Sequence, residues 1–137
     1  STSGQNNDSN FKRVSFEELL KTSDIISIHA PLNEKTKNLI SLKELKMMKN
    51  NSVLINCGRG GIVNELDLSK ALDENLIGAA CLDVLSKEPP DSDSPLLNII
   101  NKEKLFITPH TAWISVEARK RLIRGVYDNI AGFLRKK

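Results

Sequence analysis

The sequence has little of several features that would narrow its class. It contains two cysteines, Cys57 and Cys81, in 137 residues, which is too few for the disulfide framework of a small secreted domain. Both lie in apolar stretches, so we expect buried free thiols in a reducing compartment, the cytoplasm. No apolar run approaches the roughly 18 residues that a membrane-spanning helix needs, which argues against a membrane protein.

An excess of charge of one sign is also missing. Lys and Arg number 20 and Asp and Glu number 17, and the resulting net charge of +3 does not indicate nucleic-acid binding. By contrast, 39% of the residues are hydrophobic and 27% are charged, which is typical of globular proteins. The sequence therefore predicts a folded domain with its own core.

The first ten residues, STSGQNNDSN, contain no methionine, no basic cluster and no apolar stretch. These are the parts of a signal peptide, so we expect none here. We expect instead a loop from the middle of a longer protein, of which this chain would be a fragment.

From residue 11 onward, short apolar runs alternate with helical patterns. Ser15 and Ser41 each stand three residues before a glutamate, which predicts capping boxes at the starts of two helices. Asn64 and Ser115 are the predicted caps of two further helices, and the last helix has apolar residues at a spacing near 3.6. Four apolar runs are predicted to be strands: residues 24–30, 52–57, 78–84 and 105–108.

The alternation of strands and helices favours an α/β fold. Strands that are nearly all apolar indicate a parallel sheet covered on both faces, and right-handed crossovers make it doubly wound. In such a sheet the carboxyl ends of the strands meet at one edge, where ligands bind. Polar residues that follow the strand ends are therefore the candidates for a functional site.

Arg59, Asp83, Glu88 and His110 lie at or just after the ends of three predicted strands. A histidine can exchange a proton near neutral pH, a carboxylate beside it orients the ring, and an arginine grips a carboxylate or polarises a carbonyl. Such a set suits the reversible reduction of a small 2-keto acid to a 2-hydroxy acid. The hydride would have to come from a bound cofactor, because no side chain supplies one.

Other interpretations stay open at this point. Each of the four residues could have a structural or solvated role instead, and so could His29, which lies at the end of the first predicted strand. Cys57 with His110 could form a thiol nucleophile and its base, although no activating feature adjoins Cys57. The spacing of the cysteines and histidines argues against a zinc site. The basic last helix could contact nucleic acid, but a charged outer face is the simpler interpretation.

Four ordered motifs stand out in the chain. They are HAPL with a following threonine, INCGRGGIVNE, LDV with a following EPP, and TPHTAW, at residues 29–36, 55–65, 82–90 and 108–113. These motifs resemble signatures of the D-isomer-specific 2-hydroxyacid dehydrogenases, and the match extends from Val14 to Phe133. The pairing of His110 with Trp113 is more similar to the branch of glycerate dehydrogenases and hydroxypyruvate reductases.

The resemblance implies a role for each matching residue. Arg59 would bind the substrate carboxylate and carbonyl, His110 would be the catalytic acid/base, and Glu88 would be its carboxylate partner. Asp83 would hold the nicotinamide carboxamide of the cofactor, NAD. The residues implied to form the cofactor site are Ala30, Pro31, Cys57, Gly58, Arg59, Asp83, His110 and Ala112.

The resemblance also implies a domain organisation. Residues 1–114 would be part of a Rossmann-like dinucleotide-binding domain, and residues 115–137 a long crossover helix that returns toward a substrate domain. The family's Gly-x-Gly-x-x-Gly turn, which meets the cofactor pyrophosphate at a helix N-terminus, does not occur in the sequence. We therefore expect the chain alone to be inactive or nearly so.

The partners implied by the resemblance are a small 2-hydroxy or 2-keto acid, of which glycerate and hydroxypyruvate are favoured, and a second copy of the chain in a homodimer. Neither nucleic acid nor a membrane is expected as a partner, and NADP stays open beside NAD. The alternative function is a dinucleotide-sensing corepressor, which would use the same fold as a binding module without catalysis.

Overall fold

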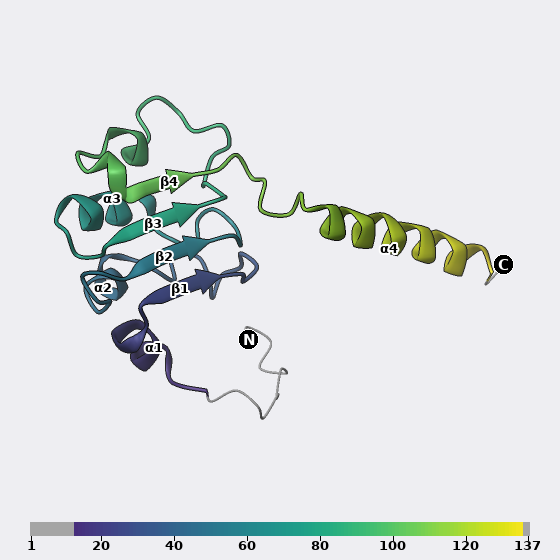
Figure 1. Cartoon of the computed structure of the whole chain (residues 1–137), viewed down its shortest axis with the longest axis horizontal. Coiled ribbons are helices and arrows are strands. Elements are labelled where there is room, and N and C mark those ends of the chain that lie inside the picture. The colour runs from purple at the N-terminus through teal and green to yellow at the C-terminus, as the bar shows by residue number, and fades with distance from the viewer. Residues whose placement is uncertain (1–12, 136–137) are drawn as a thin grey trace.

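The computed structural model describes residues 13–135, so the predicted loop at residues 1–10 lies outside the described residues. The described part contains one four-stranded sheet with connecting helices (Figure 1). In chain order the elements are α1 (Phe16–Thr22), β1 (Ile25–Ile28), α2 (Leu42–Leu45), β2 (Val53–Asn56), α3 (Glu65–Asp73), β3 (Ala79–Leu82), the short 3₁₀ helices η1 (Pro95–Asn98) and η2 (Lys102–Lys104), β4 (Leu105–Ile107) and α4 (Val116–Leu134).

The helices begin where the sequence predicts. The side-chain oxygens of Ser15, Asn64 and Ser115 accept hydrogen bonds from backbone N–H groups three residues further on, over 3.1, 3.0 and 3.2 Å. At the start of α2, the Glu44 carboxylate accepts a hydrogen bond from the backbone N–H of Ser41 over 3.1 Å. α2 is shorter than predicted, because the chain after it tightens into turns in which each N–H bonds three residues back.

All four strands are parallel and follow the order β1-β2-β3-β4, which confirms the predicted α/β class with a parallel sheet. The register aligns Ile26 with Leu54, then with Ala80 and Leu105. Consecutive right-handed crossovers that advance in one direction place their helices on the same face of the sheet. Accordingly, α1 packs against α2, and α2 packs against α3.

The two faces of the sheet differ in burial. On the face toward the helices, Leu54 and Ala80 are fully buried, whereas on the other face Ile25 and Phe106 are 63% and 60% exposed. We expected helices over both faces, but the described residues supply them for one. The reason is the consecutive strand order, which keeps the connecting helices in a single layer.

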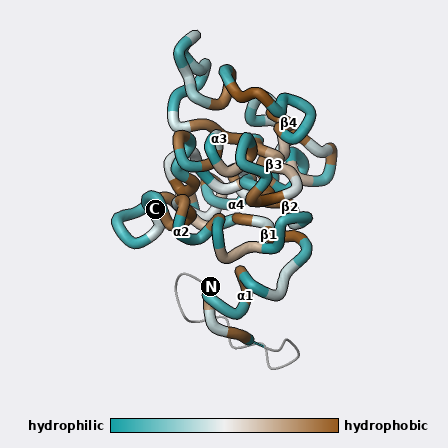
Figure 2. Tube along the Cα trace, turned by 90° about the vertical axis from the view of Figure 1, so that its left-hand side faces the viewer, coloured by the Kyte–Doolittle hydropathy of each residue, from teal (hydrophilic) through white to brown (hydrophobic). Residues whose placement is uncertain are grey.

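The core lies between the sheet and this helix layer. Figure 2 shows the hydrophobic stretches of the trace gathered around the four strands, with hydrophilic loops around them. The largest apolar side chains that are fully buried are Leu20, Ile40, Leu45, Leu54, Ile62, Leu68, Leu72, Ile77 and Leu96. Residues 13–135 contain no helix with the length and apolar character to cross a membrane.

The last helix, α4, lies apart from this core. It extends away from the sheet (Figure 1), and none of its residues is buried. The residues of its predicted apolar stripe are all more than half exposed: Val116, Leu122, Ile123, Val126, Ile130 and Phe133. Its cap and its length therefore come from local sequence, without help from tertiary packing.

Candidate active site

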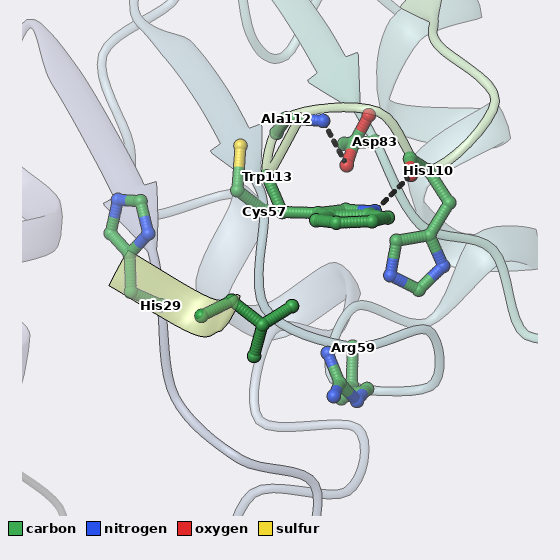
Figure 3. A pocket seen from close by; sticks show the side chains of 8 residues that line it. His29, Cys57, Arg59, Asp83, His110, Ala112 and Trp113 are labelled. Atoms are coloured by element: carbon green, nitrogen blue, oxygen red, sulfur yellow. Dashed lines mark hydrogen bonds between the residues drawn. The ribbon is translucent and has the colours of Figure 1, made fainter. Parts of the chain in front are cut away.

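The polar residues singled out at the strand ends meet at the carboxyl edge of the sheet. An open cavity of about 570 Å³ lies there (Figure 3). It is lined by His29, Cys57, Arg59, Asp83, His110, Ala112, Trp113 and Leu122. A second cavity of about 610 Å³ adjoins it, because both share His29, Cys57 and Arg59.

The second cavity contains the rest of the predicted cofactor residues. It is lined by Ala30, Pro31 and Gly58, together with Leu32 and the three shared residues. All eight residues predicted to form a cofactor site therefore line one or the other cavity. Their convergence follows from the parallel sheet, which brings the ends of β1, β2, β3 and β4 to the same edge.

The turn after β2 is shaped by Asn56, which is almost fully buried. Its side-chain amide donates to the Arg59 carbonyl over 3.0 Å, and its side-chain oxygen accepts from the Gly58 N–H over 3.0 Å. At Gly60 a Cβ would lie 1.9 Å from the Leu85 carbonyl oxygen, so the backbones touch and a side chain has no room. This close approach places Arg59 beside the loop that carries Glu88.

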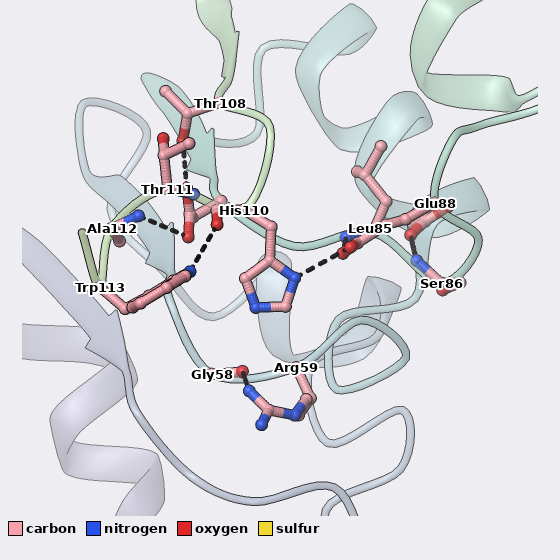
Figure 4. A network of polar contacts seen from close by, with 12 residues as sticks. Gly58, Arg59, Leu85, Ser86, Glu88, Thr108, His110, Thr111, Ala112 and Trp113 are labelled. Atoms are coloured by element: carbon pink, nitrogen blue, oxygen red, sulfur yellow. Dashed lines mark hydrogen bonds and ion pairs between the residues drawn. The ribbon is translucent and has the colours of Figure 1, made fainter. Parts of the chain in front are cut away.

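Glu88 and His110 form the polar pair predicted from the sequence. The Glu88 Oε2 lies 2.9 Å from the His110 Nδ1, and the Glu88 Oε1 accepts from the Leu85 N–H over 2.9 Å (Figure 4). The Leu85 N–H, followed by the bond with His110, lowers the pKa of Glu88 below its ordinary value. An ionised carboxylate only accepts, so the His110 Nδ1 carries the proton and Nε2 faces Arg59.

The backbone of His110 is held in an unusual conformation. Its φ is +55°, in the left-handed region, which costs a residue other than glycine about 1–2 kcal/mol. Its N–H donates to the Thr108 carbonyl over 2.9 Å, and its carbonyl accepts from the Trp113 indole Nε1 over 3.0 Å. Strain of this kind persists where the surroundings determine the conformation, often at functional sites.

Asp83, which is 5% exposed, anchors the same loop to the sheet. Its Oδ1 accepts from the Thr108 hydroxyl over 2.6 Å and from the Thr111 N–H over 2.7 Å, and its Oδ2 accepts from the Ala112 N–H over 2.9 Å. Burial alone would raise the pKa of Asp83, but these three hydrogen bonds outweigh it and hold the pKa below its ordinary value. Asp83 is therefore a buried anion that fixes the His110 loop.

Cys57 lines the cavity, but its environment does not activate a thiolate. Burial, then the negative charge of Asp83, raises the pKa of the Cys57 thiol. The interpretation as a thiol nucleophile with His110 as its base thus gains no support, because such a nucleophile needs a lowered pKa. Cys57 and Cys81 are free thiols as expected, but they are half-buried rather than buried.

Sequence reasoning missed several residues that shape the site. His29, for which a structural role stayed open, lines both cavities, and its Nε2 lies 2.8 Å from the Ser27 hydroxyl. Thr36 is buried and donates from its hydroxyl to the Pro31 carbonyl over 2.7 Å, which braces the loop after β1. Trp113 could have been found, because it is part of the TPHTAW motif. Nothing in the sequence indicated that Leu122 of α4 reaches the cavity.

Comparison with known proteins places this geometry in a family. Residues 1–112 match the model of the D-isomer specific 2-hydroxyacid dehydrogenase NAD binding domain. A glycerate dehydrogenase from Methylorubrum extorquens is 42% identical over 121 residues, which are 88% of this chain and 38% of that protein. The chain therefore spans about two-fifths of the length of such relatives.

Solved structures with a similar fold are found as well. An acyclic imino acid reductase in complex with NADPH and D-Arg superposes with a TM-score of 0.86 at 35% identity, over 98% of this chain and 42% of that one. A D-lactate dehydrogenase from Aquifex aeolicus in complex with NAD and lactic acid superposes with a TM-score of 0.78 at 27% identity, over 90% of this chain and 40% of that one.

Proposed function

Because the chain belongs to the D-isomer specific 2-hydroxyacid dehydrogenase family, of which it is an NAD-binding domain, we propose that it serves an oxidoreductase. In this proposal, hydride transfer between the nicotinamide cofactor and a small 2-keto acid forms a D-2-hydroxy acid. The observation that carries the proposal is that His110, which is paired with Glu88, lines the same cavity as Arg59. A dinucleotide sensor without catalysis would need the cavity but not this pair.

The residues at the cavities fit the nicotinamide end of NAD. Each cavity has a volume in the range of small-molecule and cofactor pockets, and both lie at the sheet edge where α/β folds bind such ligands. At Gly58 a Cβ would lie 2.7 Å from the Ala30 carbonyl oxygen, so the loops after β1 and β2 form one continuous wall. When bound, the nicotinamide supplies the hydride.

The side chains of this chain would bind the substrate and move its proton. Arg59 presents a guanidinium fork, which suits the carboxylate and carbonyl of a 2-keto acid. His110 would donate the proton from Nε2 to the carbonyl oxygen during reduction, while Glu88 stabilises the imidazolium and fixes the ring. In the reverse direction the same nitrogen would accept the proton of the hydroxyl group.

Asp83 takes a place in the proposal that differs from the one the family resemblance implies. The resemblance has it hold the nicotinamide carboxamide, but both its oxygens already accept bonds from the chain itself. We assign it first to the positioning of the His110 loop. A carboxylate oxygen can accept more than one bond, so contact with the carboxamide is compatible with this role.

The finer parts of the proposal rest on relatives. Glycerate or hydroxypyruvate is the favoured substrate because a glycerate dehydrogenase is among the similar proteins. NAD is favoured over NADP because the matching family model is that of an NAD binding domain. Residues 115–137 are assigned to a connecting helix because α4 contributes nothing to the buried core. The homodimer and the cytoplasmic location stay predictions. The molar mass in solution tests the homodimer.

Ligand binding to this chain tests the proposal. We expect NADH to shift the backbone resonances of Gly58 and Ala112 weakly, and hydroxypyruvate to shift those around Arg59 and His110. Arg59→Gln should abolish the response to hydroxypyruvate and reduce the response to NADH much less, because seven other residues of the implied cofactor site stay in place. The exposed control Arg124→Gln on α4 should change neither response. A hydroxypyruvate response that survives Arg59→Gln would contradict the proposal.

Turnover gives the second test. The chain alone should oxidise NADH with hydroxypyruvate slowly or not at all, because its sequence has no Gly-x-Gly-x-x-Gly turn for the pyrophosphate. In a longer protein that carries this domain, His110→Ala should abolish reduction and leave NADH binding largely intact. Loss of both together would indicate a structural role for His110.

A further inference from the structure

The loop between β4 and α4 has a hydrogen-bond partner for each of its first backbone donors. The N–H of Thr108 bonds to the Leu82 carbonyl, and the N–H of His110 bonds to the Thr108 carbonyl. The N–H groups of Thr111 and Ala112 bond to the Asp83 carboxylate, and Pro109 has none. The loop is therefore fixed to the end of β3 on both sides of His110.

The peptide that joins His110 to Thr111 is held at two points, because its N–H is the one that bonds to Asp83 and its carbonyl makes one further contact. Its carbonyl accepts from the indole Nε1 of Trp113, three residues further on, over 3.0 Å (Figure 4). Because His110 has the left-handed φ of +55°, a rotation of this carbonyl would accompany any return to an ordinary backbone conformation. Such a return would also turn the imidazole away from Glu88.

The environment of Trp113 leaves its indole N–H as the group that fixes the ring in place. Trp113 is 51% exposed and lines the cavity together with Arg59 and His110, so its ring is not held there by a core. An indole is a donor only and usually finds an acceptor when one end of it is buried. Here the acceptor is the carbonyl of the residue that carries the proposed acid/base.

We propose that Trp113 is a positioning residue for His110. The Trp113 indole N–H donates to the His110 carbonyl and, together with the bond from Asp83 to the same peptide, holds the left-handed backbone that directs the imidazole to Glu88. The role rests on the proposed function, because it matters for catalysis only if His110 exchanges the proton. The structural consequence can nevertheless be measured in this chain without any turnover.

The sequence offers a clean way to remove the donor alone, because Trp113 is the one tryptophan of the chain. Biosynthetic replacement of tryptophan by benzothienylalanine puts a sulfur in place of the indole N–H and keeps the size and shape of the ring. We expect exchange of the His110 Nδ1 proton with water to become about tenfold faster, because the bond to Glu88 is populated less. The nitrogen resonance of Nδ1 should shift at the same time.

Three comparisons make the result specific. Trp113→Phe, which also lacks the donor, should give the same change, whereas Ile114→Val, a neighbouring exposed position, should give none. The resonances of His29, the other histidine, should stay in place in every variant. Unchanged exchange at His110 in the benzothienylalanine chain, with the amide spectrum of β1–β4 intact, would overturn the proposal. Failure of NADH or hydroxypyruvate to bind the unaltered chain would contradict the proposed function and leave this test unaffected.

Discussion

The helices α3 and α4 begin in the same way and end in different environments. Each starts with a side-chain oxygen, from Asn64 or Ser115, that accepts a backbone N–H three residues on. α3 then buries Leu68, Ser69, Ala71 and Leu72, whereas α4 buries nothing in its 19 residues. Local sequence can thus specify a helix that does not pack against the core. The same type of substitution should therefore change stability differently in α3 and in α4.

The largest contrast should come from a leucine in each helix. Leu72→Ala removes a fully buried side chain next to the sheet and should lower the free energy of unfolding by about 3–4 kcal/mol, since it leaves a cavity. Leu134→Ala in α4, where the side chain is 62% exposed, should change it by less than about 0.5 kcal/mol. Urea unfolding followed by circular dichroism measures both. Equal effects would mean that α4 is packed in solution.

Glycine to alanine should change stability with opposite signs in the two regions. At Gly60 the added Cβ would meet the Leu85 carbonyl at 1.9 Å, and the overlap should cost about 3 kcal/mol. At Gly125, in the middle of α4, no atom lies within 4 Å of the added Cβ, and better helix propensity should stabilise the helix by about 1 kcal/mol. Thermal unfolding of the domain measures the loss at Gly60, and the helix content from circular dichroism measures the gain at Gly125, because α4 does not pack against the core. A tolerated Gly60→Ala would contradict the close contact of the two loops.

Substitution of an aspartate in each region compares a buried set of hydrogen bonds with an exposed ion pair. Asp83→Asn places an amide donor opposite one of the two backbone N–H groups that the carboxylate accepts from, and it should cost about 2 kcal/mol. Asp128→Asn on α4 removes an exposed ion pair with Arg124 at 3.9 Å, and an effect below about 0.5 kcal/mol is expected. Asp83→Asn should also broaden the resonances of residues 108–112. A sharp, unshifted loop would show that Asp83 does not anchor it.

The smallest expected effect is the acid dependence of the Glu88 pair. The folded pKa of Glu88 lies below its ordinary value of 4.5, so its contribution to stability is full above pH 4.5. That contribution is lost as the pH falls through the lowered folded pKa. Wild type should therefore be more stable than Glu88→Gln at pH 7, and the two should converge in acid. A difference that grows on acidification would contradict the assigned direction.

The sequence predicts most of the helices and strands, because these elements depend on local patterns. Ser15, Asn64 and Ser115 cap helices where their spacing indicates, and the four apolar runs form the parallel sheet. A parallel sheet in turn brings its strand ends to one edge, and this is why Arg59 and His110 could be placed at the same cavity in advance.

The details of the site could not be predicted in the same way. The bonds from Asp83 to Thr111 and Ala112 join residues 28 and 29 positions apart, so no local pattern encodes them. The left-handed backbone of His110 is equally invisible, because histidine has no intrinsic preference for it and the surrounding bonds impose it. That the described residues cover one sheet face with helices could not be predicted for a related reason, since strand order is a tertiary property.

The position of Trp113 gives the domain a built-in optical probe. One indole, at the wall of the cavity, produces all the tryptophan emission of the chain. That emission overlaps the absorption of a reduced nicotinamide, so occupancy of the cavity would quench it by energy transfer without any added label. Light from a single ring would then report when the cavity fills.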